Sequence, residues 1–553
     1  MPSARFLAAL ILCLPLLHAA QPVRARKAMV VSREPHATDA GLDVLKGGGN
    51  AIDAAVTVGL ALAVTHPWAG NIGGGGFMLI RLAGGQTTFI DFRERAPQSS
   101  TRSMYLNIFG APTSDSTLGW RAPGVPGTVR GLELAHKRYG RAKWQDLVAP
   151  AVRLARDGFP VSWGLAEMLR NNKKLPQFPE SKRIFLNNGA PFTPGDVLRQ
   201  PDLAATLERI AANAADFYEG ETARRFADEM AKHGGEIALA DLNQYAAVER
   251  KALEGSYRGY AIYTAPPPSA GGIGLLHMLG VLEGSGFDKA GAGSAASIHF
   301  VAETMRRYYA DRSEYIADPD FHPVPVKQLL DPRYIESRRR SIDLERATPS
   351  DAIKPGDLKS YESSETTHYS IVDEEGNAVA VTYTLNNGFG SGVTVPGLGF
   401  LLNDEMDDFS VKPGHPNSFG LVQGERNRIE PGKRPLSNMT PTILTRDGKL
   451  YMVTGTPGGA RIINAVLQSI INVVDFQMNM QDAVDWPRFH HQWRPDRIEV
   501  EPGISPDTRA LLAGRGHTVE LIRNFCELAA IRVEGGWLEG AADHRVEGKA
   551  AGY

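Results

Sequence analysis

The sequence predicts an α+β fold in which paired strands form sheets and helices cover their outer faces, a layered αββα arrangement. Three observations predict it. Residues 366–385 and 441–454 each have the pattern of two strands joined by a tight turn, the second with Asp447-Gly448 at its turn. Residues 462–474 repeat apolar side chains at helical spacing. Residues 127–357 are mostly helix-like, so the middle of the chain supplies further helices.

The N-terminal part predicts one more buried helix and a strand. Residues 47–64 begin with three glycines and continue in Ala, Val and Leu, which is typical of a buried helix opened by a turn. Gly73–Gly76 precede a predicted strand. A phosphate-binding loop would instead join a strand to a helix and continue into Lys-Ser/Thr, so we reject it. The glycines predict a close backbone approach beneath an active site.

Length and composition limit the class of protein. The chain has 553 residues, 42% hydrophobic and 22% charged, which indicates a soluble globular protein of several domains or one large layered fold. Its formal net charge of -2, without any block of Lys and Arg, argues against nucleic acid as a partner.

The first residues predict export. Arg5 precedes an apolar run over residues 6–17, followed by small residues and then basic ones, which is the pattern of a secretory signal peptide. We assign residues 1–25 to it, with cleavage near Ala20–Ala25. The run is shorter than the ~20 residues that cross a bilayer, so we expect no stable membrane span, although a retained anchor is an alternative. The predicted location is the periplasm or the medium.

Cysteine and histidine usage argues against a metal. Cys13 lies in the leader, which leaves Cys526 without a disulfide partner and excludes a cysteine-cluster metal site. We expect Cys526 to be a buried small hydrophobe. His490 and His491 are adjacent, so on an extended chain their side chains point opposite ways, and we interpret both as structural. We expect no metal and no cofactor.

The segment that begins Thr366-Thr-His-Tyr-Ser-Ile-Val-Asp and ends at Gly390 closely resembles the signature of the γ-glutamyltranspeptidase family, also called glutathione hydrolases. The similarity extends along almost the whole mature chain. It implies the four-layer αββα sandwich of the N-terminal-nucleophile hydrolases. It also implies self-cleavage between Glu365 and Thr366, which would give a large subunit (26–365) and a small subunit (366–553) that stay together as a heterodimer. Further matching motifs are Asp91-Phe-Arg-Glu-Arg-Ala-Pro, Leu402-Asn-Asp-Glu-Met-Asp-Asp-Phe-Ser, Arg434-Pro-Leu-Ser, Pro457-Gly-Gly and Ala551-Gly-Tyr.

The resemblance assigns the catalytic residues. Thr366 suits the nucleophile because its hydroxyl can attack the preceding carbonyl, and the freed α-amine, with a pKa of about 7.7 to 8.0, can then act as its base. Thr384 and Asn386 are two apart and share one face of a strand. In the family the threonine bonds the nucleophile, and the asparagine orients it and contacts substrate. The family forms its oxyanion hole with the pair that corresponds to Gly458 and Gly459, ahead of a helix.

Substrate contacts follow in the same way. A γ-glutamyl group carries an α-carboxylate and an α-ammonium; the resemblance assigns Arg93 to the carboxylate, and Glu405 and Asp408 to the ammonium. A solvated loop or a divalent-cation site is the alternative interpretation of the acidic run, but EF-hand-like spacing is missing. Ser437 matches the first of two serines that bind the carboxylate, and Asn438 stands at the second position; its amide can donate a hydrogen bond but is bulkier.

A loop over residues 413–422 resembles the lid of some family members, with Phe419 at the gating position. The predicted reaction transfers the γ-glutamyl group of amides such as glutathione through a Thr366 acyl-enzyme to water, an amino acid or a peptide. One alternative is a β-lactam (glutaryl or cephalosporin) acylase, which Asn438 and the unusual stretch 524–532 would favour and Asp408 disfavours. A non-catalytic peptide-binding protein is the other alternative, and the intact set of catalytic residues argues against it.

Overall fold

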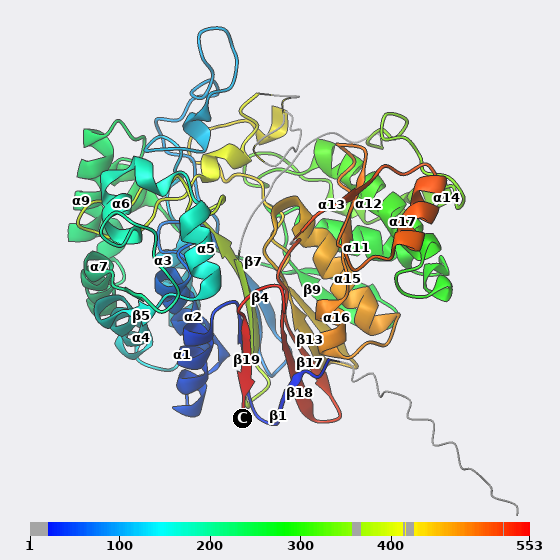
Figure 1. Ribbon diagram of the computed structural model, residues 1–553, viewed down its shortest axis with the longest axis horizontal. Coiled ribbons are helices and arrows are strands. Elements are labelled where there is room, and N and C mark those ends of the chain that lie inside the picture. The colour runs from blue at the N-terminus through cyan, green and yellow to red at the C-terminus, as the bar shows by residue number, and fades with distance from the viewer. Residues whose placement is uncertain (1–19, 357–366, 413–414, 416–417, 419–424, 524) are drawn as a thin grey trace, which may run out of the picture.

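The protein is arranged in four layers, with two β-sheets face to face and helices covering both outer faces (Figure 1). This confirms the predicted αββα sandwich. A computed structural model describes residues 20–356, 367–412, 415, 418, 425–523 and 525–553.

Among the described residues, sheet I has seven strands, and each neighbouring pair is antiparallel. The predicted hairpin of residues 366–385 lies at its centre as β10 and β11, and the predicted strand β3 begins within the glycine run. In spatial order the strands are β19 (Lys549–Gly552), β2 (Met29–Ser32), β10 (Thr367–Val372), β11 (Ala378–Thr384), β3 (Gly75–Arg81), β4 (Thr87–Phe92) and β7 (Val248–Arg250).

Sheet II also has seven strands. It contains the second predicted hairpin as β12 and β13, whose turn places Asp447 and Gly448 at φ 49° and 75°. The strands β8 and β9 come from the region predicted to be mostly helical. They are short and lie at the sheet edge with alternating half-buried side chains, so their pattern is weak. The spatial order is β1 (Val23–Ala25), β18 (Trp537–Ala542), β17 (Ala529–Glu534), β13 (Lys449–Thr454), β12 (Thr442–Arg446), β9 (Tyr260–Thr264) and β8 (Leu253–Tyr257).

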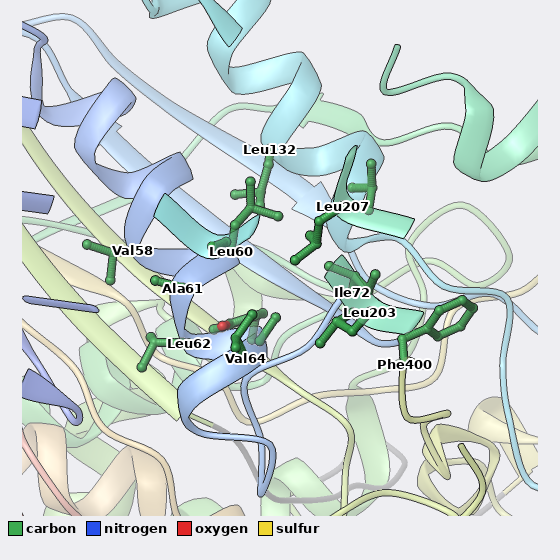
Figure 2. Packing of buried hydrophobic residues seen from close by; sticks show 14 of the residues in the cluster. Val58, Leu60, Ala61, Leu62, Val64, Ile72, Leu132, Leu203, Leu207 and Phe400 are labelled. Carbon is green, nitrogen blue, oxygen red and sulfur yellow. The ribbon is translucent and has the colours of Figure 1, made fainter. Parts of the chain in front are cut away.

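Helix α2 (Ala51–Thr65) is the predicted buried helix outside sheet I, and all of its residues are buried. The side chain of Asn50 caps it by accepting from the backbone N–H groups of Ile52 and Asp53, and the backbone N–H of Asn50 donates to the carboxylate of Asp53 at 2.9 Å. Figure 2 shows side chains of α2 packed with leucines of the neighbouring helices. The helices of this half are α1 (Pro35–Lys46), α3 (Thr128–Tyr139), α4 (Trp144–Asp157), α5 (Trp163–Asn171), α6 (Pro179–Phe185), α7 (Pro201–Ala212), α8 (Asp216–Glu219), α9 (Glu221–Lys232) and α10 (Leu239–Gln244).

Helices α11, α12 and α15 cover sheet II. The predicted periodic segment 462–474 forms α15, which confirms that helix. The helices of this half are α11 (Gly271–Leu282), α12 (Ala295–Tyr315), α13 (Val326–Leu329), α14 (Pro332–Arg340), α15 (Ile462–Val474), α16 (Met480–Asp485) and α17 (Pro506–Gly514). Short strands complete the fold: β5 (Phe159–Pro160), β6 (Val197–Leu198), β14 (Phe489–His490), β15 (Ile498–Val500) and β16 (Val519–Leu521).

The layer between the two sheets positions the candidate site. Alternate side chains of each strand point into this layer, where residues such as Phe77, Leu79 and Ile443 form one apolar cluster. In β11, Ala378 and Ala380 belong to the same cluster, so Thr384, an even number of residues further on, faces the same layer at the strand's end.

Within the part of the chain that the structure describes, no helix has the length and apolar character needed to span a membrane.

Candidate active site

The glycine run Gly73–Gly76 lies against the backbone of the candidate site. A Cβ atom on Gly74 would lie 2.0 Å from the carbonyl oxygen of Thr384, and one on Gly75 would lie 2.5 Å from that of Phe92. Such distances leave no room for any side chain at these positions. The close approach predicted from the sequence is present, and it brings the ends of β3, β4 and β11 together.

Thr384 and Asn386 form a compact turn at the end of β11. The backbone N–H of Asn386 donates to Oγ1 of Thr384 at 2.8 Å, and Asn386 has a left-handed φ of 75°. Nδ2 of Asn386 donates to the carbonyl oxygen of Asp404 at 2.9 Å, whereas its buried Oδ1 has no partner among the described residues. Thr367, which follows Thr366 in the sequence, pairs with Tyr383, the neighbour of Thr384.

Arg93 directly follows β4 and is completely buried. Its guanidinium forms ion pairs with Glu405 and Asp408 and donates to the carbonyl oxygen of Leu436 at 2.8 Å. The hydroxyl of Tyr245 donates to the carbonyl oxygen of Arg93 at 2.8 Å, which fixes the backbone at this residue. The structure thus brings the three residues predicted to bind the substrate's charged ends into direct contact.

Glu94 adds a third carboxylate to this cluster, and the sequence analysis did not single it out. Its Oε2 lies 3.6 Å from Nη1 of Arg93. Burial raises the pKa of Glu94 to about 7 and also raises that of Glu405. Burial opposes the charge of Arg93, but the surrounding carboxylates raise its pKa above the ordinary value. Three buried carboxyl groups around one guanidinium favour a second cation at this place.

Ser437 and Asn438 lie beside this cluster on a loop that a neighbouring turn holds. The N–H of Ser437 donates to the carbonyl oxygen of Pro268 at 3.0 Å, and its own carbonyl accepts from the N–H of Ala270 at 2.7 Å. The Asn438 side chain accepts a hydrogen bond from Arg312. Arg312 lies in the region that the sequence predicts to be mostly helical, and nothing in that pattern indicates its contact with Asn438.

Gly458 and Gly459 begin the turn that leads into α15, with φ of 129° and 65°. The first N–H groups of a helix lack partners within the helix, and the helix dipole is positive at this end. A Cβ atom on Gly458 would lie 2.2 Å from Sγ of Cys526. Cys526 is buried, as expected, and burial raises the pKa of its thiol, so it is a poor nucleophile.

The buried histidines make structural contacts. His368 lies between Oγ1 of Thr382 at 2.8 Å and Oγ of Ser370 at 3.1 Å, and burial lowers its pKa to about 3. His490 contacts Asn464 at 2.7 Å and is equally buried. Neither is suited to take up a proton near neutral pH.

Among the described residues, Asp485, Asp543 and His544 form a group with the composition of a metal site, and their possible ligand atoms lie within 4.8 Å of one another. Asp543 already forms ion pairs with Arg488 and Arg545. This group therefore has its charge compensated within the protein.

Three predicted residues, Glu365, Thr366 and Phe419, lie outside the described residues. In the predicted lid segment, the structure describes His415, which is exposed, and Ser418, whose N–H donates to Asp407 at 3.2 Å.

A large cleft opens beside the glycine pair. Its volume is about 940 Å³, and Gly458, Cys526, Glu527 and Trp68 contribute to its walls. The carbonyl oxygen of Trp68 accepts from the N–H of Phe389 at 2.8 Å, three residues after Asn386. The cleft therefore borders the glycine pair at Gly458, and its wall residue Trp68 is hydrogen-bonded to the turn after Asn386.

The four-layer sandwich, with these residues gathered at one end of the inter-sheet layer, defines the class: this is an N-terminal-nucleophile hydrolase. Residues 37–553 match the sequence profile of the family described as gamma-glutamyltranspeptidase, and the chain belongs to that family.

Individual relatives agree with this assignment. The chain is 51% identical over 538 residues to the glutathione hydrolase proenzyme of Escherichia coli (strain K12). The matched region covers 96% of this chain and 93% of that protein. Its structure is similar to that of cephalosporin acylase from Bacillus halodurans, with a TM-score of 0.86, 29% identity and 98% of both chains covered. Helicobacter pylori γ-glutamyltranspeptidase is 44% identical with a TM-score of 0.58, over 59% of this chain and 94% of that one.

Proposed function

We propose that the protein is a self-processing γ-glutamyl hydrolase and transferase that acts on γ-glutamyl amides such as glutathione. Its nucleophile is Thr366, freed by cleavage after Glu365. Membership of the γ-glutamyltranspeptidase family supports the reaction, and the relative at 51% identity is named as a proenzyme.

The observation that carries the substrate assignment is the buried cluster of Arg93, Glu94, Glu405 and Asp408. An α-amino acid head supplies one carboxylate for Arg93 and one ammonium for the acids, so both ends meet an opposite charge. Oδ1 of Asn386 offers a further acceptor to the ammonium. A glutaryl group has no ammonium and would leave the buried carboxylates uncompensated, which argues against the acylase alternative.

Catalysis then proceeds in two acyl-transfer steps. Oγ1 of Thr366 attacks the γ-carbonyl carbon while its α-amine takes the hydroxyl proton, and the carbonyl oxygen becomes an oxyanion held by the N–H groups at Gly458 and Gly459. The C–N bond breaks, and the leaving amine receives the proton. Water or an acceptor amine next attacks the ester carbon, which releases the glutamyl group and restores the hydroxyl. Phe419 belongs to a lid that excludes water from the ester.

Maturation uses the same hydroxyl. It attacks the carbonyl carbon of Glu365, the peptide nitrogen leaves as the new α-amine, and water hydrolyses the resulting ester. The products are the large subunit, residues 26–365, and the small subunit, residues 366–553, associated as a heterodimer.

We assign the cleft beside Gly458 to the amine side of the reaction. Its volume of about 940 Å³ accommodates a small peptide, and it borders the proposed oxyanion hole at Gly458. A leaving dipeptide and an acceptor amino acid would both occupy this cleft.

For the location we propose export to the periplasm or the medium after removal of the leader. The strand β1 at Val23–Ala25 pairs with β18, so cleavage at the Ala20 end of the proposed range would keep this strand in the mature protein.

Intact mass and N-terminal sequencing of the wild type beside Thr366→Ala test the proposal. We expect two chains in the wild type, the smaller beginning with Thr366, and one uncleaved chain in the variant. The wild type should then release γ-glutamyl groups from glutathione but leave a glutaryl amide unchanged. An uncleaved wild type would support a binding protein, and turnover of the glutaryl amide alone would support an acylase.

A further inference from the structure

We infer that Arg312 is a positioning residue that turns the Asn438 amide so that Nδ2 donates to the substrate's α-carboxylate. This inference rests on the proposed γ-glutamyl activity. It concerns the position at which the family resemblance implies a serine and this chain has an asparagine.

The chemistry of the two side chains fixes the orientation of the amide. A guanidinium has only donors, so the atom of Asn438 that faces Arg312 must be the acceptor Oδ1, as the hydrogen bond from Nη2 shows. Nδ2 then points away from Arg312. It is buried and has no partner among the described residues. A buried donor without an acceptor costs about 1 to 3 kcal/mol, which indicates that an acceptor belongs there.

The position of the amide identifies that acceptor. Asn438 lies two residues after Leu436, whose carbonyl oxygen accepts from Arg93 at 2.8 Å. The carboxylate of Asp408 lies close enough to Arg312 to stabilise the positive charge of the guanidinium. A group that reaches both the guanidinium of Arg93 and an amide N–H of Asn438 needs acceptor atoms for both, and a negative charge strengthens its bond to the guanidinium; a carboxylate provides both.

A second asparagine, Asn386, is held by the residue that precedes Glu405 and is turned the other way. The carbonyl oxygen of Asp404 can only accept, so it holds Nδ2 of Asn386 and leaves Oδ1 without a partner in the described structure. One amide therefore offers a donor and the other an acceptor. This pair matches a ligand whose head has both a carboxylate and an ammonium.

The environment of Arg312 allows it to act in this way near neutral pH. Burial lowers its pKa to about 10, so the guanidinium remains charged there. Its carbon Cζ lies 5.6 Å from the ring centre of Tyr309, and the hydroxyl of Tyr309 donates to the carbonyl oxygen of Ala460, next to the glycine pair. These contacts fix one face of the guanidinium between the carboxylate-binding loop and the start of α15.

The decisive experiment compares two substrates, γ-glutamyl-p-nitroanilide and 4-aminobutyryl-p-nitroanilide, which lacks the α-carboxylate. Asn438→Asp keeps the shape of the side chain but replaces the Nδ2 donor by a charged acceptor. We expect a rise in KM of about tenfold to hundredfold for the γ-glutamyl substrate with a smaller change in kcat, because one hydrogen bond to a charged group is lost. For the 4-aminobutyryl substrate we expect kcat/KM to change less than threefold.

Arg312→Met, Asn438→Ser and the double variant test the role of Arg312 itself. A serine hydroxyl rotates freely and does not need to be oriented, so Arg312→Met should raise KM several-fold in the Asn438 protein and much less in the Asn438→Ser protein. Arg312→Lys should restore part of the loss, because an ammonium also donates to Oδ1. Correct folding of each variant is checked by its cleavage into two chains. Should Arg312→Met fail to fold, Arg312→Lys takes its place in the same comparison, with a smaller rise in KM expected in the Asn438 protein than for Arg312→Met and none in the Asn438→Ser protein.

Two results would overturn the inference while leaving the proposed γ-glutamyl activity standing. One is an equal loss of kcat/KM on both substrates in Asn438→Asp, and the other is that Arg312→Met raises KM by the same factor in the Asn438 and Asn438→Ser proteins. A wild type that turns over neither substrate would overturn the proposed function instead.

Discussion

At the scale of single residues, His368 makes the stability of the protein depend on pH. It faces the layer between the sheets, and burial lowers its pKa to about 3. A histidine in an unfolded chain has a pKa of about 6.5. Below that pH the unfolded chain binds a proton that the folded chain does not, so the stability that this residue contributes is present above pH 6.5 and is lost as the pH falls toward 3.

We expect His368→Gln to remove this contribution. Between pH 7 and pH 5 the parent should lose about 2 kcal/mol more of its free energy of unfolding than the variant does. The measurement is urea unfolding of the uncleaved Thr366→Ala chain, with and without His368→Gln, at both pH values. Parallel losses in the two proteins would mean that His368 takes up a proton in the folded state.

The candidate site shows which residues can be predicted from sequence. Thr384, Arg93 and Asp408 lie within recognisable motifs, so they could be named from sequence alone, although their roles remain proposals. Glu94 is in the same motif as Arg93 and was passed over, because nothing in the sequence shows that its carboxyl is buried beside Glu405. Arg312 is more than 100 residues from Asn438 in sequence, so their contact follows only from the packing of α12 against the loop.

At the scale of elements, strand β3 has different requirements at its two ends. A Cβ atom on Gly74, just before the strand, would lie 2.0 Å from the carbonyl oxygen of Thr384, and backbone cannot move aside as a flexible side chain can. Gly84 lies in the turn after the strand, and a Cβ atom there would meet no atom within 4 Å. A side chain is therefore excluded at the end of the strand next to the site, whereas the turn after its other end has room for one.

We expect Gly74→Ala to slow self-cleavage at least tenfold, because Thr384 must move, while Gly84→Ala cleaves at the wild-type rate. The measurement is the appearance of the two chains on a denaturing gel with time after synthesis. If Gly74→Ala matures as fast as the control, the close contact with Thr384 has no part in maturation.

The elements themselves differ in how well their sequences specify them. Helix α15 and the hairpins β10–β11 and β12–β13 were predicted correctly, because their periodicity and turns are local signals. Strands β8 and β9 were missed, since each has five residues and the second hairpin, distant in sequence, completes their sheet. Strand β9 pairs with β12, which lies about 180 residues further along the chain, and no local pattern encodes that pairing.

At the scale of the whole molecule, both sheets alternate between the two proposed subunits. In sheet I, β2 of the large subunit lies between β19 and β10 of the small subunit, and β11 of the small subunit pairs with β3 of the large. In sheet II, β9 of the large subunit pairs with β12 of the small subunit. Separating the subunits would therefore break backbone hydrogen bonds in both sheets and expose the apolar layer between them.

We accordingly expect the cleaved protein to behave as one particle. The two chains should elute together from a sizing column even in 1 M NaCl, where the Debye length falls to about 3 Å and surface ion pairs contribute little. They should separate only in denaturant, because the association depends on backbone pairing and buried apolar area, which salt does not screen. Elution of either chain alone in high salt would show that surface charge holds the subunits together and that the shared sheets do not.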